Sequence, residues 1–183
     1  MNELAGFWKF LDSCFGKEVL DRIRELYLVS FFPSIKGWRK IMLLPQSLSL
    51  LTYDNKVRIV GGGILAGWSW KEKFIPSPHL YNFIYESTRK LGCAVVAKPH
   101  GVKAFLYGND LLLASLSKLL PPIKKGEYVA VIDPEDYRAV GVGILLYDED
   151  EIKFLVEKGE MVVAIVKNVV DLGLHIRNEK FFA

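Results

Sequence analysis

Basic and amide side chains form two groups in the second half of this 183-residue chain. Lysine and arginine contact phosphates, and amides bind bases wherever the bases are unstacked. Residues of these types supply the contacts that RNA recognition needs, although a lysine taken singly is more often a solvated surface group. The first group lies between residues 98 and 118 and the second between residues 167 and 177, and together they comprise Lys98, Lys103, Asn109, Lys118, Lys167, Asn168 and Arg177.

No catalytic constellation accompanies these groups, so we expect a protein that is not an enzyme. The serines lack a G-x-S-x-G elbow, and Cys93 has only His100 in its vicinity, with no third group to orient a base. Carboxylates between Asp133 and Asp136 are ordinary turn residues. The three histidines have no cysteine or histidine partner at metal-ligand spacing, so no metal is predicted.

A glycine-rich stretch from Gly61 to Gly67 fits a dinucleotide-binding pattern but lacks its context. Such a site needs a helix after the glycines and an acidic residue about 20 positions further on. Here Trp68, Ser69 and Trp70 alternate like a strand, and two prolines follow. We therefore predict a bend in a sheet where backbones approach closely, and no cofactor.

Charge is distributed unevenly along the chain. Residues 1–92 hold 13 Lys and Arg against 8 Asp and Glu, whereas residues 93–183 hold 11 against 13, within a total of +3. A C-terminal half that binds RNA must therefore concentrate its basic groups on one face. The N-terminal excess suggests that this half helps to hold RNA or a partner. Lys71 and Lys73 alternate with aromatic residues there, although we expect Trp68, Trp70 and Phe74 to lie in the core.

The C-terminal half has the pattern of short strands with two helices. Cys93–Ala97 is apolar enough for a buried strand, and helical spacing then runs from Pro99 to Gly108. An acidic run from Asp148 opens a second helix that closes at Gly159. Further strands are expected at 128–132, 140–146 and 161–166. The helix after Pro99 is expected to plug the end of a small closed sheet.

The N-terminal half mixes helices and strands. Two amphipathic helices separated by Gly16 come first, and strands are expected at 41–44 and 57–60. A helix that starts at Ser77–Pro78 is expected to stop at Gly92, which we take as the domain boundary. The prediction is an α+β protein, with an N-terminal α/β domain at residues 1–92 and a mainly β domain at residues 93–183.

Composition places the chain among folded proteins outside the membrane. Hydrophobic residues make up 51% and aromatic residues 13%, enough for a sizeable core. The longest uncharged stretch, Ile41–Tyr53, has 13 residues and is interrupted by Pro45, which is too short to span a bilayer. No basic segment leads into an apolar one at the N-terminus. We expect a cytoplasmic location.

The segment K-P-H-G-V-K-A-F-L-Y-G-N, residues 98–109, resembles the start of the PUA domain in the Nip-seven family of ribosome biogenesis factors. Residues 128–133, 141–143 and 166–173 are also similar, in the order that this family uses. Upstream, Gly62–Gly67 and Lys73–Phe74 resemble the family's N-terminal domain. The resemblance implies a PUA-type pseudo-barrel in residues 93–183.

The resemblance also implies where RNA binds. In PUA domains the groove lies between the first helix and the last strand, so the two groups of basic and amide residues should face each other, with Lys167 the position that matches best. It implies no catalysis, and binding to precursor ribosomal RNA during large-subunit maturation, with uridine-rich single strands as one candidate target. Ribosome assembly proteins are expected partners, and we expect a monomer. Two alternatives stay open: an RNA-targeting subunit of a tRNA- or rRNA-modifying enzyme, and a protein-interaction module.

Overall fold

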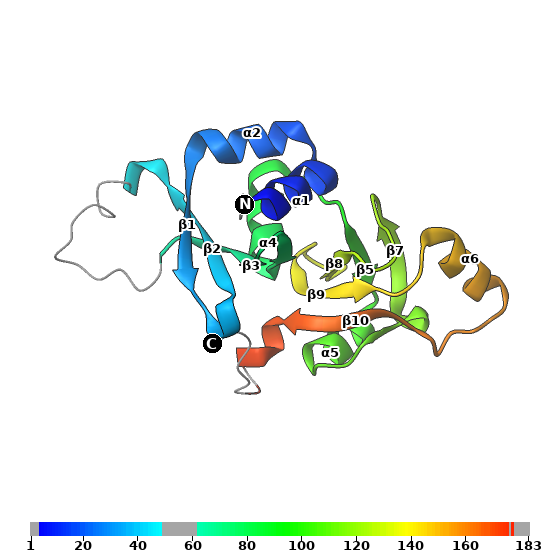
Figure 1. Ribbon diagram of the computed structural model, residues 1–183. Helices are drawn as coiled ribbons and strands as arrows, with labels where there is room; N and C mark the ends of the chain where they lie inside the picture. Colours follow the sequence, from blue (N-terminus) through cyan, green and yellow to red (C-terminus); the bar gives the residue numbers. More distant parts are fainter. Residues whose placement is uncertain (1–3, 49–61, 176, 178–183) are drawn as a thin grey trace. The chain divides into compact units, whose positions relative to one another are not determined.

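The structure, a computed structural model, describes residues 4–48, 62–175 and 177, with only the backbone at Ile35 and His175. Within it the chain divides into two compact units, the first running to Thr88 and the second beginning at Arg89. The strand expected at 57–60 lies outside the described residues. Helices and largely antiparallel sheets occur in both units, so the α+β class is confirmed (Figure 1).

Among the described residues of the N-terminal unit, three helices cover the sheet. They are α1 (Ala5–Phe15), α2 (Lys17–Leu26) and α4 (Pro78–Thr88). Gly16 separates the first two with φ 83°, in the left-handed region that glycine adopts without penalty. Phe7 of α1 and Tyr81 of α4 are fully buried, and Phe7 meets Phe74 edge to face at 5.2 Å. Aromatic packing of this kind holds the helices on the sheet.

The N-terminal sheet has four antiparallel strands in the order β1-β2-β3-β4. They are β1 (Tyr27–Pro33), β2 (Arg39–Pro45), β3 (Ile64–Trp70) and β4 (Lys73–Pro76). The strand β1 was not predicted, because the helical spacing of Val19 and Ile23 continues to Tyr27, where the structure instead begins the strand. Segments β1 and β2 form a hairpin joined by the short 3-10 helix η1 (Ile35–Gly37).

The glycine-rich stretch continues into strand β3, not into a helix. Gly63 has φ 80° and lies against the backbone of Leu43, while Gly67 lies against Ile75. A side chain at either position would meet a neighbouring strand, which confirms the prediction of a sheet bend with close backbone approach. The helix N-terminus that a dinucleotide site requires is not built by this segment.

The end of α4 differs from the prediction. The helix stops at Thr88, and Arg89 takes the left-handed conformation with φ 57°. Gly92, the predicted stop, lies four residues beyond, so Arg89 and Lys90 are outside the helix. The helical spacing of Leu80 and Ile84 extends to Leu91 in the sequence, which is why the pattern alone placed the end too late.

The C-terminal unit is a six-stranded sheet in the order β6-β10-β9-β8-β5-β7. Its strands are β5 (Ala94–Ala97), β6 (Leu111–Leu112), β7 (Leu116–Leu120), β8 (Tyr128–Ile132), β9 (Ala139–Leu145) and β10 (Ala164–Asp171). Only β5 and β8 pair in parallel. One cluster of buried side chains forms the core of this unit, with Phe105, Val129 and Leu145 fully buried. The strand predicted at 161–166 is shifted, because Met161 and Val162 are exposed in a turn.

Two helices complete this unit. The first, α5 (Pro99–Leu106), and the second, α6 (Glu149–Glu157), lie where the sequence predicted them. Asp148 and Glu151 form a reciprocal capping box at the start of α6, and Gly159 closes its end with φ 74°. None of the helices in the described part of the chain is both long and apolar enough to cross a bilayer.

Candidate nucleic-acid interface

Helix α5 presents one buried face and one exposed face. Pro99 occupies its first position after Lys98, where a missing N–H leaves no partner unsatisfied. Val102 and Phe105 belong to the core, whereas Lys103 and Tyr107 are exposed. Lys103 is in the last turn of α5, and Tyr107 is the residue that caps its C-terminal end. Tyr107, 74% exposed, was missed by the sequence reasoning, although its spacing from Lys103 was the available signal.

Side chains from β10 and the turn after it satisfy the C-terminal carbonyls of α5. The last carbonyls of a helix have no partner within the helix itself. The side-chain nitrogen of Asn168 donates to the carbonyls of Phe105 at 2.9 Å and Asn109 at 3.3 Å. Arg177 Nη1 donates to the carbonyl of Leu106. Two of the predicted RNA-binding residues thus hold α5 against β10, beside which it lies in Figure 1.

The guanidinium of Arg177 also pairs with Asp171. Its Nη1 and Nη2 atoms lie 3.0 and 3.1 Å from the two carboxylate oxygens, a bidentate geometry. The Asp171 side chain is only 2% exposed and that of Arg177 is 18% exposed. Gly173, in the 3-10 helix η4 (Leu172–His175), leaves room for this pair, since a side chain there would meet both Asp171 and Arg177. The positive charge of Arg177 is therefore largely neutralised by Asp171 within the C-terminal unit.

Two further predicted residues make local contacts at the two ends of α5. Lys98 Nζ donates to the carbonyl of Ala114 at 2.7 Å, and the Asn109 side chain donates to the carbonyl of Ala104 at 3.1 Å. Both side chains are exposed, so these bonds compete with water and leave the groups accessible.

Lys103, Lys118 and Lys167 are exposed, and within the described residues the structure records no ion pair for any of them. Lys103 lies in the last turn of α5 and Lys167 on β10, two elements that contact each other. Lys118 lies on β7, which three strands separate from β10 in the sheet order. The structure thus groups Asn109, Asn168 and Arg177 around the end of α5, and records no contact that joins Lys118 to them. Their contact with RNA stays a prediction.

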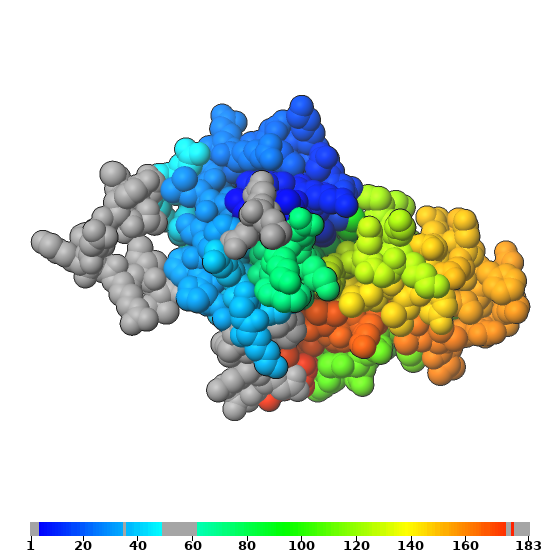
Figure 2. Space-filling model, viewed as in Figure 1, coloured from blue at the N-terminus to red at the C-terminus, as the bar shows by residue number. Residues whose placement is uncertain are grey.

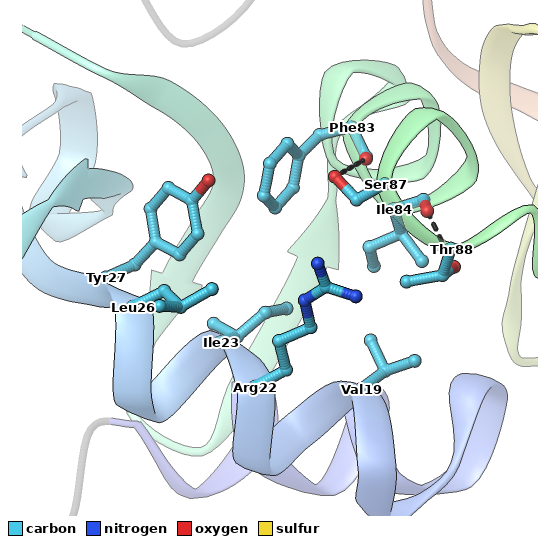
Figure 3. A pocket seen from close by; sticks show the side chains of 9 residues that line it. All are labelled: Val19, Arg22, Ile23, Leu26, Tyr27, Phe83, Ile84, Ser87 and Thr88. Atoms are coloured by element: carbon cyan, nitrogen blue, oxygen red, sulfur yellow. Dashed lines mark hydrogen bonds between the residues drawn. The ribbon is translucent and has the colours of Figure 1, made fainter.

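The N-terminal unit holds an apolar pocket between α2 and α4 (Figure 3). Its lining includes Val19, Ile23 and Phe83, with the guanidinium of Arg22 pointing into the opening. The hydroxyls of Ser87 and Thr88 donate to carbonyls of their own helix at 2.8 and 2.7 Å. The nine described lining residues include no carboxylate, histidine or cysteine.

Groups that could hold a metal ion are also not assembled in the part of the chain that the structure describes, where no three His, Cys, Asp or Glu side chains gather. Among the aromatic residues near Lys71 and Lys73, Trp68 and Phe74 are buried as expected, at 5% and 8% exposed. Trp70 is 37% exposed, so the expectation that it lies in the core is wrong.

Residues 93–180, which lie in the C-terminal unit, match the family model of the UPF0113 PUA domain. No curated protein matches the sequence. The PUA-type fold that the resemblance implied is therefore confirmed for this unit.

Solved structures share the fold over most of the chain. A hypothetical protein from the hyperthermophilic archaeon Pyrococcus horikoshii is similar with a TM-score of 0.65 and 19% identity, over 93% of this chain and 92% of that one. A conserved PUA domain protein from Thermoplasma acidophilum has a TM-score of 0.57 and 15% identity, over 87% and 91% of the two chains. A PUA domain from Aeropyrum pernix has a TM-score of 0.51 and 17% identity, over 85% and 80%. The likeness includes residues of both units.

Proposed function

We propose that this protein is a non-catalytic RNA-binding protein, similar to the Nip-seven family, that acts on precursor ribosomal RNA in large-subunit biogenesis in the cytoplasm. The observation that carries the proposal is the PUA domain, in which α5 is tied to β10 while Lys103 and Lys167 stay exposed on those two elements. A fixed helix beside a strand keeps the two lysines in a constant relation, as a phosphate-binding surface requires.

In this mechanism the protein positions RNA and does not change it. Lys103 and Lys167 contact phosphates, and the exposed side chain of Tyr107 lies at the C-terminal end of the same helix as Lys103. Phosphate contacts supply affinity that falls with salt but carries no sequence information. Ribosome assembly proteins would then recognise the bound complex.

Filter binding of the full-length protein to ribosomal, transfer and homopolymeric RNA tests this function. We expect the double variant Lys103→Ala/Lys167→Ala to weaken binding to single strands by about tenfold at low salt. The matched control is Lys153→Ala/Lys158→Ala, which removes the same charge from α6. Equal affinity of the wild type and the first variant would contradict the proposal. A preference for transfer RNA, with a co-purifying enzyme, would favour the targeting-subunit alternative.

Exposed apolar side chains favour a protein-interaction role as the second candidate. They lie on α6 and in the turn after it, and both segments are at the surface of the C-terminal unit in Figure 2. Phe154 is 54% exposed, Val156 51% and Val162 82%. If this were the whole function, the wild-type protein would bind none of the RNAs in the filter assay, and Phe154→Glu would abolish capture of assembly proteins without affecting the fold.

A further inference from the structure

Two hairpin turns meet at one end of the N-terminal sheet. The β1–β2 turn contains η1, and the β3–β4 turn contains Lys71 and Glu72. Arg39 on β2 pairs with Ser69 on β3, which places the two turns side by side. Trp38 and Trp70 are therefore neighbours, with ring centroids 6.1 Å apart and planes inclined by 33°. In the space-filling view the β1–β2 hairpin, in light blue, reaches the surface (Figure 2).

The aromatic rings at this end are accessible. Trp70 is 37% exposed, and Phe31, Phe32 and Trp38 are each partly exposed. Residues 31–34 and 37–39 line a hollow in the surface. Gly37 lies against the indole nitrogen of Trp70, since a side chain there would come within 3.6 Å of it. The turn thus lies against the nitrogen-bearing edge of the indole.

Cations surround these rings. Lys71 Nζ lies 4.7 Å and Lys73 Nζ 6.0 Å from the centre of the Trp70 ring, and the Arg39 guanidinium lies 5.7 Å from the centre of the Phe31 ring. Lys36 is exposed in the first turn. Residues 27–48 and 62–77 include all four strands. They contain five Lys and Arg but one acidic residue, Glu72.

The backbone of both turns is strained at lysines. Lys36 and Lys71 each have φ 55°, a conformation that glycine or asparagine adopts more easily. Folding alone would favour glycine at these two positions. Side chains kept in sparsely populated backbone regions occur often at binding sites, and here both carry a positive charge beside the tryptophans.

We propose that this end of the N-terminal sheet, defined by Trp38, Trp70, Lys36, Lys71 and Lys73, binds a single-stranded segment of RNA. Bases stack on the exposed indole of Trp70, and the lysines contact the flanking phosphates. Unpaired nucleic acid is bound by aromatic rings interleaved with cations. Every base has a flat face that stacks on a ring, and every phosphate carries a negative charge that a cation contacts. A duplex keeps its bases stacked on each other, so its phosphates would contact the lysines but none of its bases would stack on Trp70.

An acidic protein segment is the competing occupant. Carboxylates would satisfy the lysines, but they would leave the exposed indole of Trp70 without a stacking partner. The alternation of rings and charges therefore favours RNA. This surface is separate from the one in the PUA domain, so either proposal can fail while the other stands.

Binding of the full-length protein to a fluorescent oligouridine of about ten nucleotides, a length that such surfaces accommodate, tests the proposal. We expect Trp70→Leu to weaken binding about tenfold, and Trp70→Phe, which keeps a flat ring, to stay within about threefold of the wild type. Intrinsic tryptophan fluorescence should be quenched by the oligonucleotide in the wild type and less so in Trp70→Leu. Far-ultraviolet circular dichroism checks that each variant is folded.

A second variant tests the charges without touching the ring. Lys71→Gln/Lys73→Gln should reduce the slope of log affinity against log salt by about 1.4, which is about 0.7 for each lost phosphate contact. Lys9→Gln/Lys17→Gln, on the exposed faces of α1 and α2, is the matched control and should leave the slope unchanged.

Three outcomes would overturn the proposal: wild-type affinity in both test variants, equal affinity for a duplex of the same length, or displacement of the RNA by polyglutamate at comparable concentration. Loss of binding in Lys103→Ala/Lys167→Ala alone, with the Trp70 and Lys71 variants unaffected, would retain the proposed function and reject this second surface. The reverse pattern would support the second surface and reject the PUA site.

Discussion

The PUA unit and the N-terminal sheet both carry basic residues at positions suited to RNA, but they use them differently. Around the end of α5, Arg177 is 18% exposed and bonded to a buried carboxylate and a helix carbonyl. At the end of the N-terminal sheet, Lys71 and Lys73 lie over an exposed tryptophan and have no ion pair within the described residues. A basic residue near a binding surface can thus belong to the scaffold or to the ligand site, and its burial and partners distinguish the two.

The largest effect is expected where a cation serves the scaffold. Arg177→Ala would leave the Asp171 carboxylate, 2% exposed, without its positively charged partner and with the Asn168 amide as its remaining side-chain donor, and we expect the free energy of unfolding to fall by about 3 kcal/mol. Urea denaturation measures it. Arg138→Ala is the control, because its pair with Asp136 is open to solvent and 3.8 Å long, and we expect a change below about 0.5 kcal/mol. Similar losses in the two variants would remove the distinction drawn from burial.

Asn168→Asp tests the same scaffold through an amide. The change removes the donor to the Phe105 carbonyl and places a negative charge at the C-terminal end of a helix, 3.2 Å from Asp171 in the wild-type geometry. We expect a loss of about 2 kcal/mol in unfolding free energy. Asn109→Asp, at an exposed amide bonded to Ala104, should lose less than about 1 kcal/mol. A larger loss at Asn109 would show that the amide of Asn168 does not hold the helix.

The dependence of RNA affinity on salt concentration distinguishes the two proposed RNA-binding surfaces. In the PUA unit we expect Lys103→Ala/Lys167→Ala to lower both affinity and salt slope, the slope by about 1.4. In the N-terminal unit we expect Trp70→Leu to lower affinity with the slope unchanged, because stacking releases no counterions. Fluorescence anisotropy at several salt concentrations measures both quantities. A slope that falls in Trp70→Leu would mean that the indole acts by positioning the lysines.

The smallest effect is expected for the surface pair of Lys125 and Glu151, whose side chains are 51% and 45% exposed. Hydrogen bonds from the Asp148 backbone N–H and from Lys125 lower the pKa of Glu151, and the hydrogen bond to Glu151 raises the pKa of Lys125. A lowered carboxylate pKa gives stability that is present above the ordinary value of 4.5 and is lost as the pH falls through the folded-state value. The raised pKa of Lys125 gives stability that is present below 10.5 and is lost above it.

The difference in melting temperature between the wild type and Glu151→Gln should therefore be small at pH 7 and shrink further at pH 3. Glu157→Gln, an exposed change of the same kind on the same helix, is the control. A difference that grows on acidification would contradict the assignment.

Local patterns predicted the helices of the C-terminal unit well, because Pro99 and the acidic run at Asp148 are start signals that act within one turn. The roles of Asn168 and Arg177 could not be predicted, since their partners are backbone carbonyls 63 and 71 residues away. Trp68 and Trp70 are two residues apart in β3, so they share one face of the strand. Trp70 is the last residue of that strand and is 37% exposed, whereas Trp68 is buried, and the alternation alone does not encode where the strand ends.

The bond between Arg177 and Leu106 spans 71 residues, and this has a consequence for biosynthesis. During translation α5 is synthesised long before the side chains that bond to its C-terminal carbonyls. The Leu106 carbonyl therefore lacks its side-chain donor until Arg177, which follows η4, has been synthesised. Closing so long a loop is slow compared with forming the helix itself. The PUA unit reaches its final form late, when the last of its contacts becomes available.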